Sequence, residues 1–122
     1  MKLSLSRTER DDVAIMTVSG EVDVYTAPQL RSALEERVAA DQTKVVVDLS
    51  GVSFIDSTGL GVLVGRLKVL RKVGGSLRVV CTDERILRLF AITGLDRVLP
   101  IHDSVDSALA SVDETADPEV TA

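Results

Sequence analysis

Apolar and polar residues alternate near the start of the chain in two short runs, over residues 3–9 and 13–19. Alternation with a period of two is typical of half-buried β-strands. An Asp-Asp pair separates the runs, which predicts an N-terminal β-hairpin. Gly20 interrupts the pattern, so we expect residues 21–25 to form a loop or a short strand.

The next segment has helical spacing, with an apolar residue at every fourth position from Leu30 to Val38. Thr26 precedes it as a candidate N-cap, and Gln29 stands where it would complete a capping box. A proline in the first turn is also favourable there, because its missing N–H is not needed. We therefore predict a helix that ends near residue 40.

Residues 44–49 form a continuous apolar run, as expected for a central strand covered on both faces. We expect a turn at Ser50-Gly51, and then a long apolar helix that begins after Ser57. Gly74-Gly75 should end this helix, and residues 77–81 form the next strand. Two strands joined by a helix predict a β-α-β unit with parallel strands.

The rest of the chain predicts two further helices. Asp83 is the expected N-cap of the first, and Gly94 stands at its C-terminal end. Residues 95–101 are expected to form a short strand. Asp103 or Ser104 should start the last helix.

The chain has 122 residues, enough for one domain with one core. We expect a single α/β domain over residues 1–112, with a mixed central sheet of about five strands and about four α-helices. Residues 113–122 contain four acids and no base, and we expect them to form an acidic, disordered tail.

Charge argues against nucleic acid and membrane partners. The formal net charge is -5, but outside the tail there are 15 acids against 14 bases. A nearly neutral body has no basic face for a phosphodiester backbone and no polybasic patch for lipid. With no signal peptide and no run long enough to span a bilayer, we expect a cytoplasmic protein.

Candidate chemistry is concentrated at Asp56-Ser57-Thr58-Gly59, at the predicted start of the long helix. Backbone N–H groups lack partners there and the helix dipole is positive, which favours a phosphate. Asp56, Ser57 and Thr58 are all residue types that cap helices. One cap suffices, so the other two are surplus.

Glycines follow at positions 59, 61 and 65 and suggest a dinucleotide-binding motif. That motif needs its first glycine directly after the strand, whereas here about ten residues intervene. Glycine inside a helix costs about 1 kcal/mol relative to alanine. Close packing, or a surface that another molecule approaches, is the better interpretation.

No other residues suggest catalysis. A nucleophilic serine needs a base, and the one histidine of the chain, His102, stands near a predicted strand end, where a surface role is the more common one. Its one cysteine, Cys81, lies in an apolar run and is expected to be a buried small hydrophobe. No cluster has the spacing of metal ligands. We therefore expect no enzymatic activity, no cofactor and no metal.

Two blocks of sequence together resemble a known family. They read G-E-V-D-V-Y-T-A over residues 20–27 and V-V-D-L-S-G-V-S-F-I-D-S-T-G-L-G over residues 46–61. The chain is similar to the STAS domain of bacterial anti-sigma factor antagonists over about residues 3–112, in the order of elements as well as in motif. The resemblance implies the STAS fold.

The resemblance also implies a phosphorylation switch. In that family the serine after the aspartate, here Ser57, is phosphorylated by the anti-sigma factor, a serine kinase related to histidine-kinase ATPase domains. The unphosphorylated antagonist binds this kinase and frees the sigma factor, and a PP2C-type phosphatase resets the phosphorylated form. Thr58 would be a minor acceptor, and Asp56 would cap the helix or orient the loop.

The same resemblance places Glu21 and Asp23 on the docking surface, where they would offer carboxylates to the kinase. Solvated charges in a turn are the alternative interpretation. Gly59, Leu60 and Gly61 would form the first helical turn against which the kinase closes. Two other functions stay open, namely a constitutive STAS scaffold subunit of a transport or signalling complex, and a nucleotide-binding enzyme.

Overall fold

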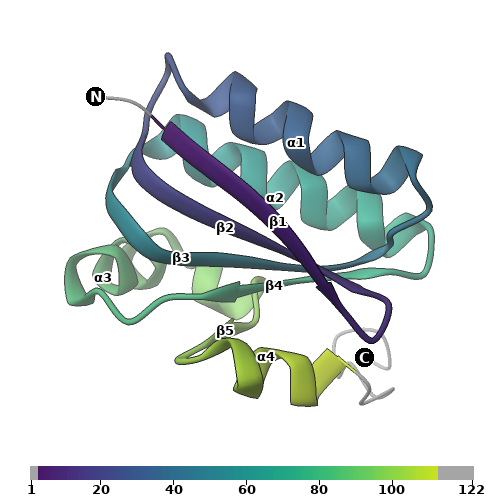
Figure 1. Ribbon diagram of the computed structural model, residues 1–122. Helices are drawn as coiled ribbons and strands as arrows, with labels where there is room; N and C mark the ends of the chain where they lie inside the picture. The colour runs from purple at the N-terminus through teal and green to yellow at the C-terminus, as the bar shows by residue number, and fades with distance from the viewer. Residues whose placement is uncertain (1–2, 113–122) are drawn as a thin grey trace.

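The computed structural model describes residues 3–112, which form a five-stranded mixed sheet in the order β1-β2-β3-β4-β5 with four α-helices (Figure 1). The elements are β1 (Leu3–Arg10), β2 (Val13–Val22), α1 (Ala27–Ala39), β3 (Lys44–Ile55), α2 (Ser57–Lys72), β4 (Ser76–Val80), α3 (Glu84–Thr93), the 3-10 turn η1 (Leu95–Arg97), β5 (Ile101–His102) and α4 (Val105–Val112). The predicted fold class, N-terminal hairpin and parallel β-α-β unit are confirmed. The expected tail over residues 113–122 lies outside the described residues.

The sheet has a helix layer on each face. Figure 1 shows α1 and α2 side by side on one face and α4 on the other. Val45 and Val47 of β3 point into the larger core with α1, α2 and α3, whereas Val46 points into a smaller core with α4. β3 is therefore buried on both faces, as its continuous apolar run predicts.

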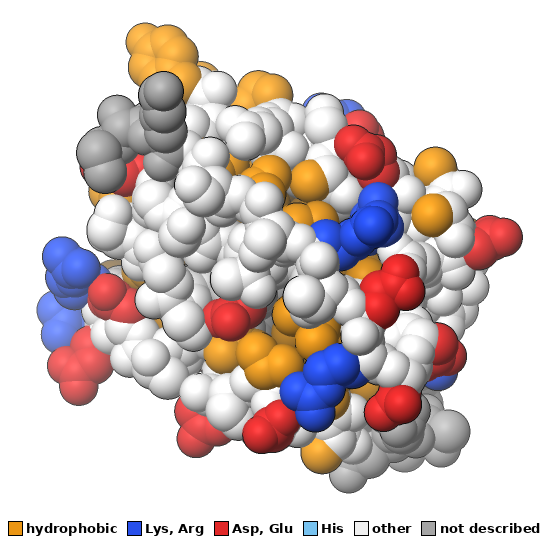
Figure 2. All heavy atoms as spheres, in the orientation of Figure 1, with side chains coloured by type: hydrophobic (Ala, Val, Ile, Leu, Met, Phe, Trp, Pro, Cys, Tyr) orange, Lys and Arg blue, Asp and Glu red, His pale blue; other side chains and the backbone are white. Residues whose placement is uncertain are grey.

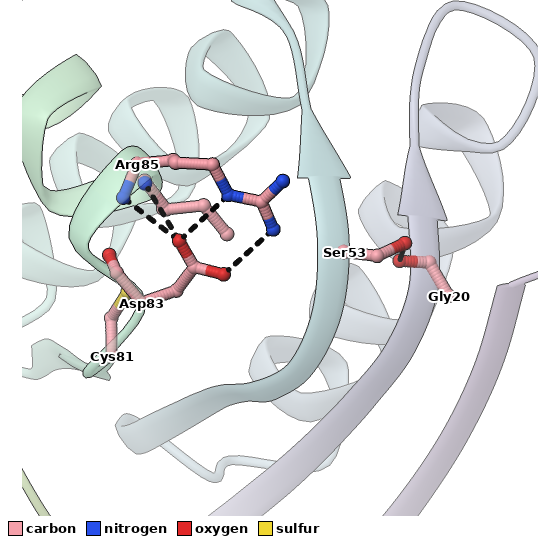
Figure 3. Close-up of polar contacts among 6 residues, drawn as sticks. Gly20, Ser53, Cys81, Asp83 and Arg85 are labelled. Atoms are coloured by element: carbon pink, nitrogen blue, oxygen red, sulfur yellow. Dashed lines mark hydrogen bonds and ion pairs between the residues drawn. The ribbon is translucent and has the colours of Figure 1, made fainter.

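Two glycines were predicted to interrupt strands, and both predictions are wrong. β2 continues through Gly20 and β3 continues through Gly51, with two register shifts between these strands. A Cβ on Gly51 would lie 2.7 Å from the Cβ of Ser19, so glycine there allows a close approach between strands. The Ser53 hydroxyl donates a hydrogen bond of 3.3 Å to the Gly20 carbonyl across the same pair (Figure 3). These glycines mark irregular strand pairing, not turns.

The helix ends follow most of the capping signals. Asp83 caps α3 by accepting hydrogen bonds from the backbone N–H groups of Arg85 and Ile86 (Figure 3). Its carboxylate also pairs with the Arg85 guanidinium at 3.1 Å, and this side-chain bond is the main reason why the pKa of Asp83 is lowered. Gly94 ends α3 with φ 76°, in the left-handed region, as predicted.

The capping box predicted at the start of α1 does not form. Thr26 stands at the N-cap position but makes no capping hydrogen bond. Its hydroxyl donates to the Glu21 carbonyl at 2.8 Å, and the Gln29 side chain donates to the Leu3 carbonyl at 3.4 Å. Both side chains are therefore used for longer-range contacts with the sheet.

The strand expected over residues 95–101 is mostly absent. Residues 95–97 form η1, where the Leu99 N–H bonds to the Leu95 carbonyl at 2.8 Å, and only Ile101 and His102 pair with β4. Local bonding and the missing N–H of Pro100 shorten the strand. Within residues 3–112, no helix is both long and apolar enough to cross a membrane.

Candidate functional site

The candidate site lies where β2 and β3 end side by side. These strands are parallel, and their register places Glu21 beside Phe54 and Val22 beside Ile55. The Asp56 N–H then donates a hydrogen bond of 3.1 Å to the Val22 carbonyl. The two sequence blocks that carry the family resemblance are therefore adjacent in space.

Asp56 is the N-cap of α2. Its Oδ1 accepts hydrogen bonds from the Thr58 N–H at 2.9 Å and from the Gly59 N–H at 3.2 Å. These two backbone donors are therefore already satisfied. A free phosphate bound at this helix start would have to displace Asp56 and overcome its negative charge, which argues against a phosphate-binding or nucleotide-binding pocket.

Ser57 and Thr58 occupy the first two positions of α2 and are exposed. Within residues 3–112, neither hydroxyl takes part in a hydrogen bond. Asp56 therefore supplies the one cap that the helix needs, and the two hydroxyls are left accessible from solvent.

Asp23 organises the turn between β2 and α1. Its Oδ1 accepts hydrogen bonds from the backbone N–H groups of Tyr25 at 2.9 Å and Thr26 at 3.0 Å. The pKa of Asp23 is lowered, chiefly by the bond from the Thr26 N–H. One carboxylate oxygen is thus used within the turn, and Oδ2 is the atom left for a partner. Glu21 is half-buried at the end of β2.

The glycines of α2 have different surroundings. A Cβ on Gly59 would lie 2.6 Å from Cγ1 of Val22 and 2.8 Å from Cγ1 of Ile55, so Gly59 lets the helix start pack tightly on the strands. Gly61 and Gly65 have open space at the same position. Leu60 is 4% exposed and belongs to the core, so its side chain supports the surface from below.

A shallow groove between α1 and α2 extends from this helix start. Its volume is about 350 Å³, and it is lined by Arg31, Thr58, Gly61, Val62, Gly65 and Arg66. Glu35 pairs with Arg31 at 3.3 Å and with Arg66 at 3.5 Å, so both cations are held at the groove. Sequence reasoning missed these arginines because nothing in their local pattern distinguishes them from ordinary surface charges.

Exposed apolar side chains occur in the two segments that meet at the Asp56 cap. Val24 and Tyr25, in the turn after β2, are 58% and 88% exposed, and Phe54, at the end of β3, is 48% exposed. Sequence reasoning missed them as site residues. A signal was available, because Tyr25 and Phe54 are two of the three aromatic residues and both lie in the motif blocks.

The one histidine and the one cysteine among residues 3–112 both have structural contacts. The ring nitrogens of His102 contact Ser107 and Ser111 at 3.2 Å, on the α4 side of the sheet. Cys81 is buried, and desolvation raises its pKa. No group of metal-ligating side chains occurs in residues 3–112.

Comparison with known proteins places these features in a family. The family model for the STAS domain matches residues 4–108. The chain is 42% identical over 104 residues to the anti-sigma-B factor antagonist of Listeria monocytogenes, a match that covers 84% of this chain and 91% of that protein. It is 40% identical over 101 residues to the anti-sigma-B factor antagonist of Bacillus subtilis, with coverage of 83% and 92%.

A solved structure agrees with these relatives. The crystal structure of an anti-sigma factor antagonist from Mycobacterium paratuberculosis is 34% identical and superposes with a TM-score of 0.85, over 91% of this chain and 94% of that one. The chain therefore belongs to the STAS domain family. The relatives are named anti-sigma-B factor antagonists, and this name agrees with the expectation of a regulatory protein that is not an enzyme.

Proposed function

We propose that this protein is an anti-sigma factor antagonist that binds an anti-sigma factor in its unphosphorylated form and is released by phosphorylation of Ser57. The observation that carries the proposal is the exposed Ser57 hydroxyl beside a helix cap that Asp56 already completes. The names of the relatives support the antagonist role.

The partner surface would combine Ser57 with the exposed apolar residues Tyr25 and Phe54, the bare turn at Gly61 and the groove between α1 and α2. Aromatic side chains are enriched in protein interfaces because they bury much area at small entropic cost. Glu21 and the free oxygen of Asp23 would face basic groups of the partner. Thr58 is the minor candidate for phosphorylation.

A phosphate on Ser57 would affect the stability of the folded chain and its affinity for a partner differently. It adds roughly -1.5 to -2 charges, and a helix N-terminus stabilises an exposed anion by about 0.3–1 kcal/mol. Burying that charge beside Asp56 under a partner would cost several kcal/mol without a matching cation, which lowers affinity by tens- to thousands-fold. The fold should therefore tolerate phosphorylation, and the complex should not.

The complete switch needs two further proteins. The anti-sigma factor would itself be the ATP-dependent serine kinase, and a PP2C-type phosphatase would remove the phosphate. The kinase would supply the catalytic groups, since the Asp56 carboxylate caps the helix and His102 contacts Ser107 and Ser111 of α4. The cytoplasmic location expected from the sequence is part of the same proposal.

The test uses the full chain and a candidate anti-sigma kinase with ATP. Wild type should gain one phosphate at Ser57, located by mass spectrometry, whereas Ser57→Ala should bind the kinase without modification. Ser57→Asp should bind at least about tenfold more weakly, a difference of about 1.4 kcal/mol. Ser104→Asp is the matched control, because it adds the same charge at the start of α4, where Ser104 caps the Ser107 N–H.

Two results would contradict the proposal. Phosphate found only at another residue would remove Ser57 as the switch. Binding of Ser57→Asp as tight as that of wild type would favour the constitutive scaffold instead.

A further inference from the structure

β1 forms one edge of the sheet, and part of this edge is open. Its hairpin to β2 closes at the pair Arg10 and Val13 through a two-residue turn, Asp11 and Asp12, with φ of 51° and 66°. The closing pair of such a hairpin exchanges two hydrogen bonds, and bonded pairs then alternate along the strands. The peptide groups of Leu5, Arg7 and Glu9 therefore point away from β2.

The contacts of β1 agree with this alternation. The Leu3 carbonyl, which points outward by the same rule, accepts the hydrogen bond from Gln29. Within residues 3–112, no such bond reaches the main chain of Leu5, Arg7 or Glu9. The edge is thus closed at Leu3 and open from Leu5 to Glu9.

A depression of about 410 Å³ borders the open edge on the α1 side. It is lined by Leu5, Ser6, Arg7, Met16, Ala33, Glu36 and Arg37. Figure 2 shows hydrophobic side chains lying open between β1 and α1, next to a Lys or Arg side chain. The border therefore combines an apolar floor with positive charge.

Arg37 gives this depression an unsatisfied donor. The residue is 7% exposed, and its Nε has no hydrogen-bond partner. Its NH1 donates to Gln42 Oε1 at 2.6 Å, and Gln42 in turn donates to Glu9 Oε1 at 2.5 Å. Its NH2 also lies 3.8 Å from Glu36 Oε1, so the guanidinium is held at the border of the depression and adds positive charge there.

We infer that the open edge pairs with the β1 edge of a second copy of this chain, antiparallel and with the two-fold axis at Thr8. This register places Arg7 opposite Glu9 of the second copy, and Glu9 opposite Arg7. Each such pair exchanges two main-chain hydrogen bonds and brings opposite charges together on one face. The surface is self-complementary, as a two-fold interface requires.

Other registers are less favourable for stated reasons. An axis at Arg7 or at Glu9 sets each of these charges against its own copy, and like charges directly opposite are destabilising. An axis at Ser6 sets Glu9 against Leu3, whose carbonyl is already bonded to Gln29. Charges on edge strands commonly prevent indiscriminate pairing. Of the four registers compared, only the one that joins Arg7 to Glu9 avoids both a like-charge pair and the bonded Leu3 carbonyl.

The pairing also uses the depression. Leu5 and Arg7 line it, so Glu9 of the second copy enters from the side where Arg7 and Arg37 lie. The end of β2 and the start of α2, which carry Ser57, are not part of the paired segment. The dimer would therefore present two antagonist surfaces, and its existence does not depend on the proposed switch.

Charge exchange tests the inference. Sedimentation equilibrium of the full chain up to about 1 mM should show a monomer–dimer equilibrium. Arg7→Glu and Glu9→Arg should each weaken the dimer by about tenfold or more, because two attractive pairs become repulsive. The double variant Arg7→Glu/Glu9→Arg restores both pairs and should recover the wild-type constant within about threefold. Arg88→Glu, an exposed residue of α3, has the same net charge as Arg7→Glu and should dimerise like wild type.

Amide hydrogen exchange gives a second readout at the level of single residues. The N–H groups of Arg7 and Glu9 should become protected as concentration rises, whereas that of Thr8, bonded to β2, should not change. A chain that is monomeric throughout this range, or a double variant as weak as the single ones, would overturn the inference. Circular dichroism of each variant establishes that it is folded.

Discussion

Replacing either of two glycines of α2 by alanine should change the free energy of unfolding, but in opposite directions for Gly59 and Gly61. In Gly59→Ala the new methyl group would lie 2.6 Å from Cγ1 of Val22 and 2.8 Å from Cγ1 of Ile55. Both neighbours are buried, and contacts below 3.0 Å force atoms to shift. In Gly61→Ala the same group meets no atom within 4 Å.

The magnitudes follow from packing and helix propensity. Overpacking a closed site costs about 1–3 kcal/mol, and the gain in propensity from glycine to alanine is at most about 1 kcal/mol. Gly59→Ala should therefore lower the free energy of unfolding by about 1–2 kcal/mol. In Gly61→Ala the helix propensity improves and the new methyl group meets no atom, so the free energy of unfolding should rise by about 0.5–1 kcal/mol.

Urea unfolding followed by far-UV circular dichroism measures both changes against wild type. The transition midpoints should shift in opposite directions while the slopes stay equal. If Gly59→Ala were as stable as wild type, the tight seating of the helix start on β2 and β3 would be refuted. If Gly61→Ala were destabilising, the open space at that position would be refuted.

Three further predictions concern the same end of the sheet. Asp56→Ala should lower the free energy of unfolding by about 0.5–2 kcal/mol in urea melts because two first-turn N–H groups lose their acceptor, whereas Asp56→Asn should retain most of it. The hydrogen bond from the Thr26 N–H lowers the pKa of Asp23, so the Asp23 carboxylate stabilises the folded state at neutral pH. This contribution is lost in acid, as the pH falls from about 3.9, the pKa of Asp in an unfolded chain, through the lower pKa of the folded state. Wild type and Asp23→Asn should thus differ in urea melts at pH 7 and converge in acid; a constant difference would contradict this linkage. Tyr25→Ala, at an 88% exposed position, should leave the free energy of unfolding within about 0.5 kcal/mol of wild type, and should weaken anti-sigma factor binding in calorimetry by about tenfold; unchanged affinity would remove Tyr25 from the interface.

Signals that act within a few residues were reliable guides to the fold. Asp56 and Asp83 cap helices and Gly94 ends one, because a short polar side chain or a left-handed residue acts on its own neighbouring backbone. The capping box at Thr26 and Gln29 failed for the converse reason. Both side chains found acceptors on strands that are distant in sequence or separated by a turn.

Strand length was predicted poorly for a similar reason. Gly20 and Gly51 were expected to break strands, since glycine weakens a strand in isolation. In the folded sheet a Cβ on Gly51 would lie 2.7 Å from the Cβ of Ser19, and Gly20 has a φ of 102°, a conformation that favours glycine. Whether a glycine marks a turn or irregular pairing depends on the neighbouring strand.

By itself, the sequence determined the order of most elements and the position of Asp56-Ser57-Thr58 at a helix start, because periodicity and capping are local properties. Only the tertiary structure decided that Asp56 takes the cap, that Ser57 and Thr58 stay exposed, and that Tyr25 and Phe54 lie open near them. It also decided which glycine is packed and which is bare. Burial and exposure are set by what the rest of the chain brings against a residue, so they become defined only when the strands and helices have met.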